Sequence, residues 1–171
     1  MESIANFVEQ PLCWHPFADR SVQYELVSDA YGIPLAQLDM RTWPTSAYGY
    51  IADGSFIIKR TGELSSRAVI FATSVEEPLA FYDHRDQVLH FADDSVFVWS
   101  GAHMFSSALS WRTVSEQSLI QYELMPVSHE VTMTITESAT SRPALSVLPL
   151  LAVLGCYIIA CDRRENAGTY K

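Results

Sequence analysis

The sequence has few cysteines, and none stand in the pairs used by disulfide frameworks or zinc motifs. Its three cysteines are Cys13, Cys156 and Cys161, and no Cys-x-x-Cys pair occurs. The first ten residues, MESIANFVEQ, lack the basic segment and the long apolar stretch of a secretory signal peptide. These absences argue against a disulfide-stabilised secreted domain. We therefore expect a cytoplasmic protein with reduced, packed thiols.

Basic side chains are scarce, with 11 Lys and Arg against 20 Asp and Glu and a formal net charge of −9. Such a charge repels nucleic acid and anionic lipid surfaces at long range. We therefore expect no nucleic-acid partner. The acidic residues are scattered rather than gathered in a tail, which is typical of a solubilising surface. An acidic surface of this kind would suit a basic partner.

Motifs for catalysis are missing as well. The sequence contains no G-x-S-x-G elbow, no Cys–His signature and no glycine-rich phosphate loop. Cys156 and Cys161 lie in an apolar run, where a thiol is a poor nucleophile. We predict a protein that is not an enzyme, with no catalytic residues and no cofactor.

The spacing of the five histidines indicates no metal site. None has another histidine four residues away, as a helical zinc site requires. Cys13 and His15 are two residues apart, a spacing that matches no recognised zinc motif. Surface or hydrogen-bonded histidines are the simpler interpretation, and we predict no bound metal.

What the sequence does contain is a series of short β-type segments. About eleven runs rich in Val, Ile, Phe, Tyr, Trp and Thr lie between residues 22 and 136, separated by turn residues. Several alternate cleanly, as Val131, Met133 and Ile135 do with the threonines between them. Others, such as FII at 56–58 and VFVW at 96–99, are apolar on both faces and must be covered on both or meet a partner.

The short connections between these runs favour an antiparallel meander. They span two to six residues, whereas parallel strands need long crossovers. So many strands would curl into a barrel or split into a sandwich. We assign one domain, residues 1–171, in which 22–143 supply the barrel strands. Residues 1–21 mix prolines and aromatics without a period, and we expect them to cap one end of the barrel or to lie across its surface.

Near the carboxy terminus, 18 uncharged and mostly apolar residues follow one another from Ala144 to Cys161. The run is just long enough to cross a membrane. It could equally be a helix that fills a barrel too wide for its own side chains. Arg163 and Arg164 follow at once, which suits neither membrane orientation well. We favour a central helix at 144–161 and a tail at 162–171, with a membrane anchor as the alternative.

Three segments carry a resemblance to a known group of proteins. They are DGSFIIKRTG at 53–62, HFADDSVFVW at 90–99, and LSWRTV with Trp111 ahead of the apolar run. This order resembles the Tubby-like superfamily, which includes the phospholipid scramblases and the LURP-one-related proteins. The resemblance implies a mainly β fold, a closed antiparallel barrel of about 12 strands around a central hydrophobic C-terminal helix.

The resemblance also implies a function. We expect a non-enzymatic binding or scaffold protein of the Tubby-like, LURP-one-related type, which contacts lipid head groups or an unknown protein partner without a transmembrane anchor. The alternative is a membrane-tethered all-β module anchored by residues 144–161.

One basic cluster is a candidate anion site. Lys59 and Arg60 end one predicted strand, and Arg67 lies across the predicted hairpin. If Arg60 and Arg67 faced one another, they could hold a phosphate or a lipid head group. The alternative is that these charges pair with acidic residues such as Glu63 in solvent.

Overall fold

The structure is a computed structural model of the 171-residue chain, and it describes residues 1–17, 20–61, 66–101, 109–125, 128 and 130–168. A short 3₁₀ helix, Ile4–Phe7, precedes the strands, and another, Glu137–Thr140, follows them. One α-helix, α1 (Arg142–Gly168), ends the described chain. The strands are β1 (Pro11–Phe17), β2 (Arg20–Ser28), β3 (Pro34–Asp39), β4 (Ser46–Ile51), β5 (Gly54–Thr61), β6 (Arg67–Ala72), β7 (Pro78–Asp83), β8 (Val88–Phe91), β9 (Val96–Ser100), β10 (Leu109–Thr113), β11 (Ser118–Leu124) and β12 (Val131–Ile135).

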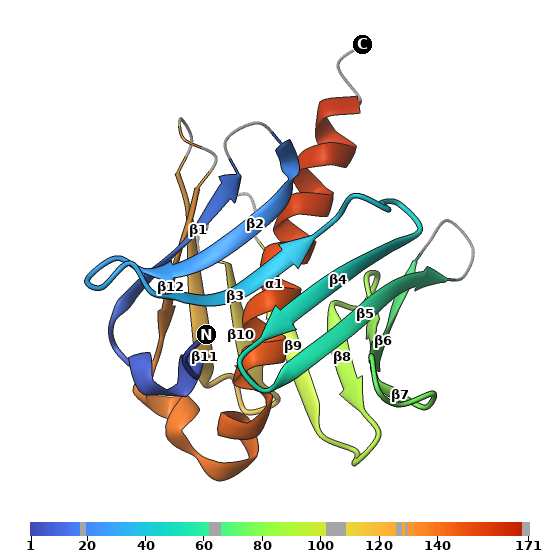
Figure 1. Ribbon diagram of the computed structural model, residues 1–171. Coiled ribbons are helices and arrows are strands. Elements are labelled where there is room, and N and C mark those ends of the chain that lie inside the picture. Colours follow the sequence, from blue (N-terminus) through green and yellow to red (C-terminus); the bar gives the residue numbers. More distant parts are fainter. Residues whose placement is uncertain (18–19, 62–65, 102–108, 126–127, 129, 169–171) are drawn as a thin grey trace.

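The twelve described strands form one closed antiparallel barrel, as predicted. Each strand pairs with its neighbours in the chain, and β1 pairs with β12 to complete the ring, with Trp14 opposite Val131. Figure 1 shows this ring of strands surrounding α1. Because the strands run alternately up and down, every second connection lies at the same end of the barrel.

The prediction that residues 1–21 cap the barrel was wrong for residues 11–17, which form β1. This strand lies between β2 and β12 and closes the barrel. Its two prolines obscured it, but both occupy tolerated positions. Pro11 is the first residue of the strand, and Pro16 adjoins an irregularity in the pairing with β2.

The alternation seen in the sequence sorts side chains between the interior and the outside. On β12, Val131, Met133 and Ile135 are buried, while the threonines between them are partly exposed. On β9 and β10, Trp99 and Trp111 stand opposite each other inside the barrel, with ring centroids 5.1 Å apart. The interior is therefore lined by large apolar rings that need a partner along the barrel axis.

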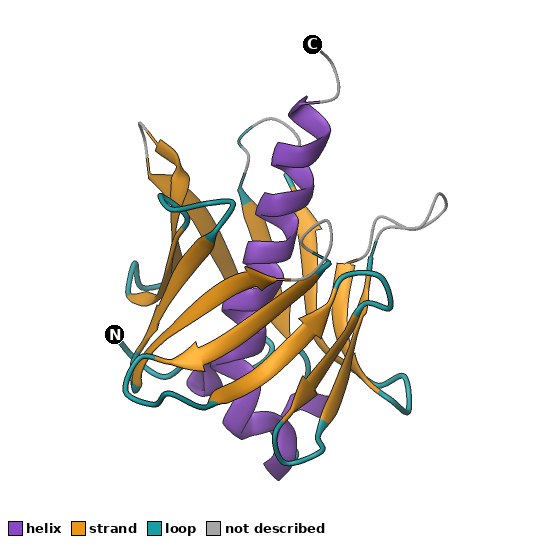
Figure 2. Ribbon diagram, turned by 90° about the vertical axis from the view of Figure 1, so that its right-hand side faces the viewer, coloured by secondary structure: helices purple, strands orange, loops and turns teal. Residues whose placement is uncertain are grey.

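That partner is α1, which confirms the predicted central helix. Every residue from 150 to 161 is buried, and Figure 2 shows the helix running through the barrel. By length and composition, the helical segment Ala144–Glu165 could cross a membrane, because an 18-residue stretch of it has a mean hydropathy of 2.4. However, 78% of that stretch is buried inside the protein. The helix is longer than the predicted 144–161. It begins at Arg142 and continues to Gly168, through most of the segment that we expected to be a tail.

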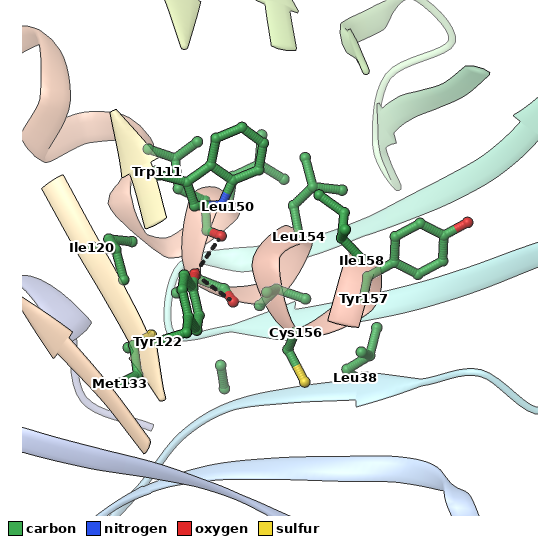
Figure 3. Close-up of a cluster of buried hydrophobic side chains, with 14 of the residues drawn as sticks. Leu38, Trp111, Ile120, Tyr122, Met133, Leu150, Leu154, Cys156, Tyr157 and Ile158 are labelled. Atoms are coloured by element: carbon green, nitrogen blue, oxygen red, sulfur yellow. Dashed lines mark hydrogen bonds between the residues drawn. The ribbon is translucent and has the colours of Figure 1, made fainter. Parts of the chain in front are cut away.

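Tyr122 of β11 sets the depth of the helix in the barrel. Its hydroxyl donates hydrogen bonds to the carbonyl oxygens of Leu151 and Ala152, at 3.0 and 3.3 Å (Figure 3). The ring lies against Gly155, where a Cβ atom would collide with the Tyr122 hydroxyl and ring. Glycine is required at this position because only a bare backbone leaves room for the ring.

Replacing Gly155 by alanine should lower stability by about 1–3 kcal/mol, the usual cost of overpacking a core. The added methyl group would displace Tyr122 and break its hydrogen bonds to the helix. Urea unfolding followed by circular dichroism would measure the loss. Gly101→Ala is the matched control, because a Cβ there meets only the Gln87 side-chain amide. Equal stabilities of the two variants would contradict this account of the packing.

Ending the chain after Arg142 should abolish cooperative folding. The truncation removes the side chains that fill the barrel, each worth about 1.5–3 kcal/mol when buried. Their sum exceeds the total stability of a typical domain, about 5–15 kcal/mol. Near-ultraviolet circular dichroism and a thermal melt would test this. A truncated chain that melts cooperatively would show that the helix is dispensable.

Candidate functional site

The first candidate site is the end of the barrel where α1 emerges, which we call the helix mouth. It is formed by Trp43 before β4, Arg60 at the end of β5, His84 after β7, and Tyr157 and Glu165 on α1. Figure 1 shows the last turns of the helix leaving the barrel at this end. The strand ends bring together residues that are far apart in the sequence.

Arg60 is the central side chain of the helix mouth. Arg60 lies on the inner face of β5 together with Phe56 and Ile58, and its side chain is only 10% exposed. Its Nη1 donates a hydrogen bond to Glu165 Oε1 at 2.8 Å. The Arg60 guanidinium carbon lies 5.9 Å from the Trp43 ring centroid, and that of Arg164 lies 5.3 Å from it. These contacts tie the end of the helix to the barrel rim.

His84 adds a neutral polar group to the helix mouth. Its ring packs edge-on against Tyr82 at 4.8 Å, and Nε2 is buried without a hydrogen-bond partner among the described residues. Burial lowers the pKa of His84, and the neighbouring Arg60 lowers it further. Burial also raises the pKa of Tyr157 on the helix. At neutral pH His84 and Tyr157 are therefore uncharged, while Arg60 and Glu165 form an ion pair.

The structure does not bring Lys59, Arg60 and Arg67 to one point. Arg60 opposes Ala68 and faces inward, whereas Lys59 and Arg67 face outward on β5 and β6. The Lys59 ammonium lies 5.0 Å from the Phe71 ring centroid. Arg67 Nε donates to Asp83 Oδ2 at 3.2 Å. Anion binding by this set stays a prediction, and Glu63, its expected partner, lies outside the described residues.

The second candidate site is a patch on the outside of the barrel, which we call the apolar face. It spans β4 to β8 and consists of Tyr48, Ile57, Val69, Phe71, Leu79, Phe81 and His90. The strand registers place these side chains in adjoining rows, because Ile57 opposes Tyr48 and Phe71, and Phe81 opposes Val69 and His90.

The apolar face is open to solvent. Leu79 is 39% exposed and Phe81 is 42% exposed. The Phe81 and His90 rings stack on each other with centroids 4.9 Å apart. Contiguous exposed apolar patches on soluble proteins mark interaction sites more often than chance positions do. The sequence had indicated this, because FII at 56–58 was apolar on both faces.

Acidic turns border the apolar face at the end of the barrel opposite the helix mouth. The exposed acids there come from the β4–β5, β6–β7 and β8–β9 turns, and they are Asp53, Glu76, Glu77, Asp93 and Asp94. None of these turns contains Lys or Arg. Backbone and hydroxyl hydrogen bonds from Ser95 lower the pKa of Asp93 and keep it ionised. We call this group the acidic rim.

A shallow groove of about 290 Å³ adjoins the apolar face at β3 and β4. Tyr48 and Tyr50 form one side, and Asp39 and Arg41 form the other. Arg41 Nε donates to Asp39 Oδ2 at 2.8 Å. Desolvation works to raise the pKa of Asp39, but hydrogen bonds from Arg41 and Gln23 outweigh it and lower the pKa. The polar groups of the groove thus already pair with each other, and its tyrosines extend the apolar face.

Comparison with solved structures shows a related fold. The X-ray structure of an Arabidopsis thaliana protein, AT5G01750, aligns with 86% of this chain and 94% of its own, with a TM-score of 0.53 and 8% sequence identity. At this identity the match concerns the fold alone. No family model matches the chain, and no curated protein matches it either.

Replacing Asp162 by asparagine should stabilise the protein at neutral pH. Although the residue is exposed overall, partial desolvation at the helix mouth and the nearby Glu165 raise the pKa of Asp162 to about 6. A carboxyl whose pKa is raised by folding stabilises the folded state when protonated, and this stabilisation is lost as the pH rises through about 6. Solvent screening limits the expected gain to about 1 kcal/mol.

Thermal melts at pH 4 and pH 7.5 would check this expectation for Asp162→Asn. The variant should gain stability over the wild type at pH 7.5 and match it more closely at pH 4. Asp53→Asn, in an exposed turn at the opposite end, is the control. A variant that is no more stable at pH 7.5 than the wild type would show that Asp162 is not strained by its surroundings.

Proposed function

We propose that the chain is a non-enzymatic binding or scaffold protein of the Tubby-like, LURP-one-related type, which acts in the cytoplasm by holding a protein partner on the outside of its barrel. Twelve strands around a central apolar helix are the architecture expected of that superfamily. The match to the Arabidopsis structure supports the fold. The helix occupies the interior, so binding falls to the outer surface and the rim.

The observation that carries this proposal is the apolar face. Outward aromatic and aliphatic side chains on β6, β7 and β8 stand in register, so they offer one continuous surface rather than isolated contacts. Covering Leu79 and Phe81 removes apolar area from water at about 25 cal/mol per Å². Large rings held rigidly by neighbours lose little side-chain entropy on binding, as interface anchors generally do.

Charge indicates the kind of partner. The acidic rim would attract a segment in which Lys or Arg flanks apolar residues, and complementary charges speed association and orient the partner. The same rim and the net charge of −9 disfavour an anionic membrane surface. We therefore favour a basic, amphipathic protein segment over a lipid head group.

The apolar run of α1 is part of the same proposal. Residues 150–161 are enclosed by the strands, which supports a role in the core for this run rather than in a membrane. We accordingly propose no transmembrane anchoring, and recovery of the protein as a soluble species without detergent is the corresponding expectation.

A random peptide library displayed on phage would test the proposed surface. Panning on the full chain should enrich peptides in which Lys or Arg flanks aromatic or aliphatic residues. Binding of those peptides to the Phe71→Ser/Phe81→Ser variant should fall at least tenfold, because the anchors of the apolar face are removed. Tyr31→Ser, which alters a 68% exposed ring outside the apolar face, is the matched control.

The acidic rim can be tested separately with the selected peptides. Neutralising Glu76, Glu77, Asp93 and Asp94 to their amides should lower the association rate, and the difference should shrink at high salt. Peptides that bind the double serine variant as well as the wild type would refute the apolar face. Flotation with anionic phospholipid vesicles that is lost in Lys59→Ala/Arg67→Ala would instead assign a lipid partner.

A further inference from the structure

A second cluster of reactive side chains lies on the outer surface where the barrel closes. Cys13 and His15 are two residues apart on β1, so they face the same side of the strand. Glu130 immediately precedes β12, the closing neighbour of β1. His15 Nδ1 lies 2.8 Å from Glu130 Oε1 and 4.0 Å from Cys13 Sγ. All three ligand atoms lie within 4.8 Å of one another.

We propose that Cys13, His15 and Glu130 bind a divalent transition-metal ion of the zinc class across the closing seam of the barrel. Thiolate, imidazole and carboxylate are the donors that such ions take from proteins. Metal–ligand bonds of about 2.0–2.3 Å place the donors of a tetrahedral site roughly 3.3–3.6 Å apart. The observed separations of His15 Nδ1 from Glu130 Oε1, 2.8 Å, and from Cys13 Sγ, 4.0 Å, lie on either side of that range. Small side-chain rotations would therefore complete the site.

The surroundings of the thiol favour a cation. The carboxylates of Glu130 and Asp29 act electrostatically on the Cys13 thiol. Glu25 of β2 pairs with His15 in the strand register and adds another carboxylate nearby. A bound cation would relieve the repulsion that these carboxylates impose on the thiolate, and the thiol proton would pass to the buffer.

One ligand of the proposed site is buried, and the other two are partly exposed to solvent. Cys13 is 6% exposed, whereas the side chains of His15 and Glu130 are 40% and 33% exposed. Ser128 donates to the second carboxylate oxygen of Glu130 at 2.8 Å, which orients the ligand. Three protein ligands with an open side leave the fourth coordination position to water. His15 would coordinate through Nδ1 as the neutral imidazole, with its proton on Nε2.

A metal ion bound at this site would link the first strand, β1, to the last strand, β12. His15 and Glu130 are 115 residues apart, and β1 pairs with β12 where the barrel closes. An ion that binds the folded state and not the unfolded one raises stability by mass action. The separation also explains why the spacing of Cys13 and His15 alone had indicated no metal.

Titration of the full chain with Co²⁺ would test the site directly, after treatment with a chelator. A thiolate ligand gives a charge-transfer band in the near ultraviolet, and a four-coordinate ion gives intense visible bands. Both should appear at one ion per chain and disappear when Zn²⁺ displaces Co²⁺. The charge-transfer band should be lost in Cys13→Ser, and His15→Gln and Glu130→Gln should each weaken binding at least tenfold. Cys156→Ala, which removes a thiol inside the barrel, is the control.

Thermal stability gives a second measurement that does not depend on one variant folding well. Zn²⁺ should raise the melting temperature of the wild type and leave that of His15→Gln unchanged. Absence of a charge-transfer band, or a band that survives Cys13→Ser, would overturn the site. A melting temperature of the wild type that Zn²⁺ does not raise would reduce the cluster to a His15–Glu130 ion pair.

Discussion

The packing of α1 against the inner face of the barrel is the constraint on which the rest of the structure depends. Twelve antiparallel strands enclose a space that their own side chains cannot fill, and the wall presents large rings such as Trp99 and Trp111. A helix apolar on all sides satisfies every part of that wall at once. Tyr122 then fixes the helix by donating to its backbone, and Arg60 holds its end through Glu165.

In the proposed function, the filled interior leaves only the outer surface and the rim for recognition. Barrels that leave their centre open bind ligands there, but here the described interior is protein. The outer surface is uneven, with apolar side chains gathered on β4 to β8 and the acidic rim bordering them. The meander produces this distribution, because alternate turns meet at one end and alternate side chains share one face. The same geometry brings the Cys13, His15 and Glu130 donors together at the seam.

Most of the architecture could be predicted from the sequence, because alternation and short turns are local signals. The exception was β1, where Pro11 and Pro16 hid a strand whose identity depends on pairing with β12. The helix mouth was beyond such reasoning, since Arg60 and Glu165 are 105 residues apart. The opposite orientations of the Lys59 and Arg60 side chains could have been predicted, because successive residues of a strand face opposite sides of the sheet. The acidic rim could also have been predicted, because every second turn of an antiparallel meander lies at the same end of the barrel.

The order of the elements along the chain has a consequence for biosynthesis. The strands that form the wall are all translated before α1, and β1 waits for β12 before it gains its second neighbour. Until the ribosome has released the helix, the inward tryptophans lack the helix that covers them, and until β12 has been made the first strand keeps an unpaired edge. Such nascent chains are prone to aggregate, so this architecture would benefit from chaperones that shield the growing sheet.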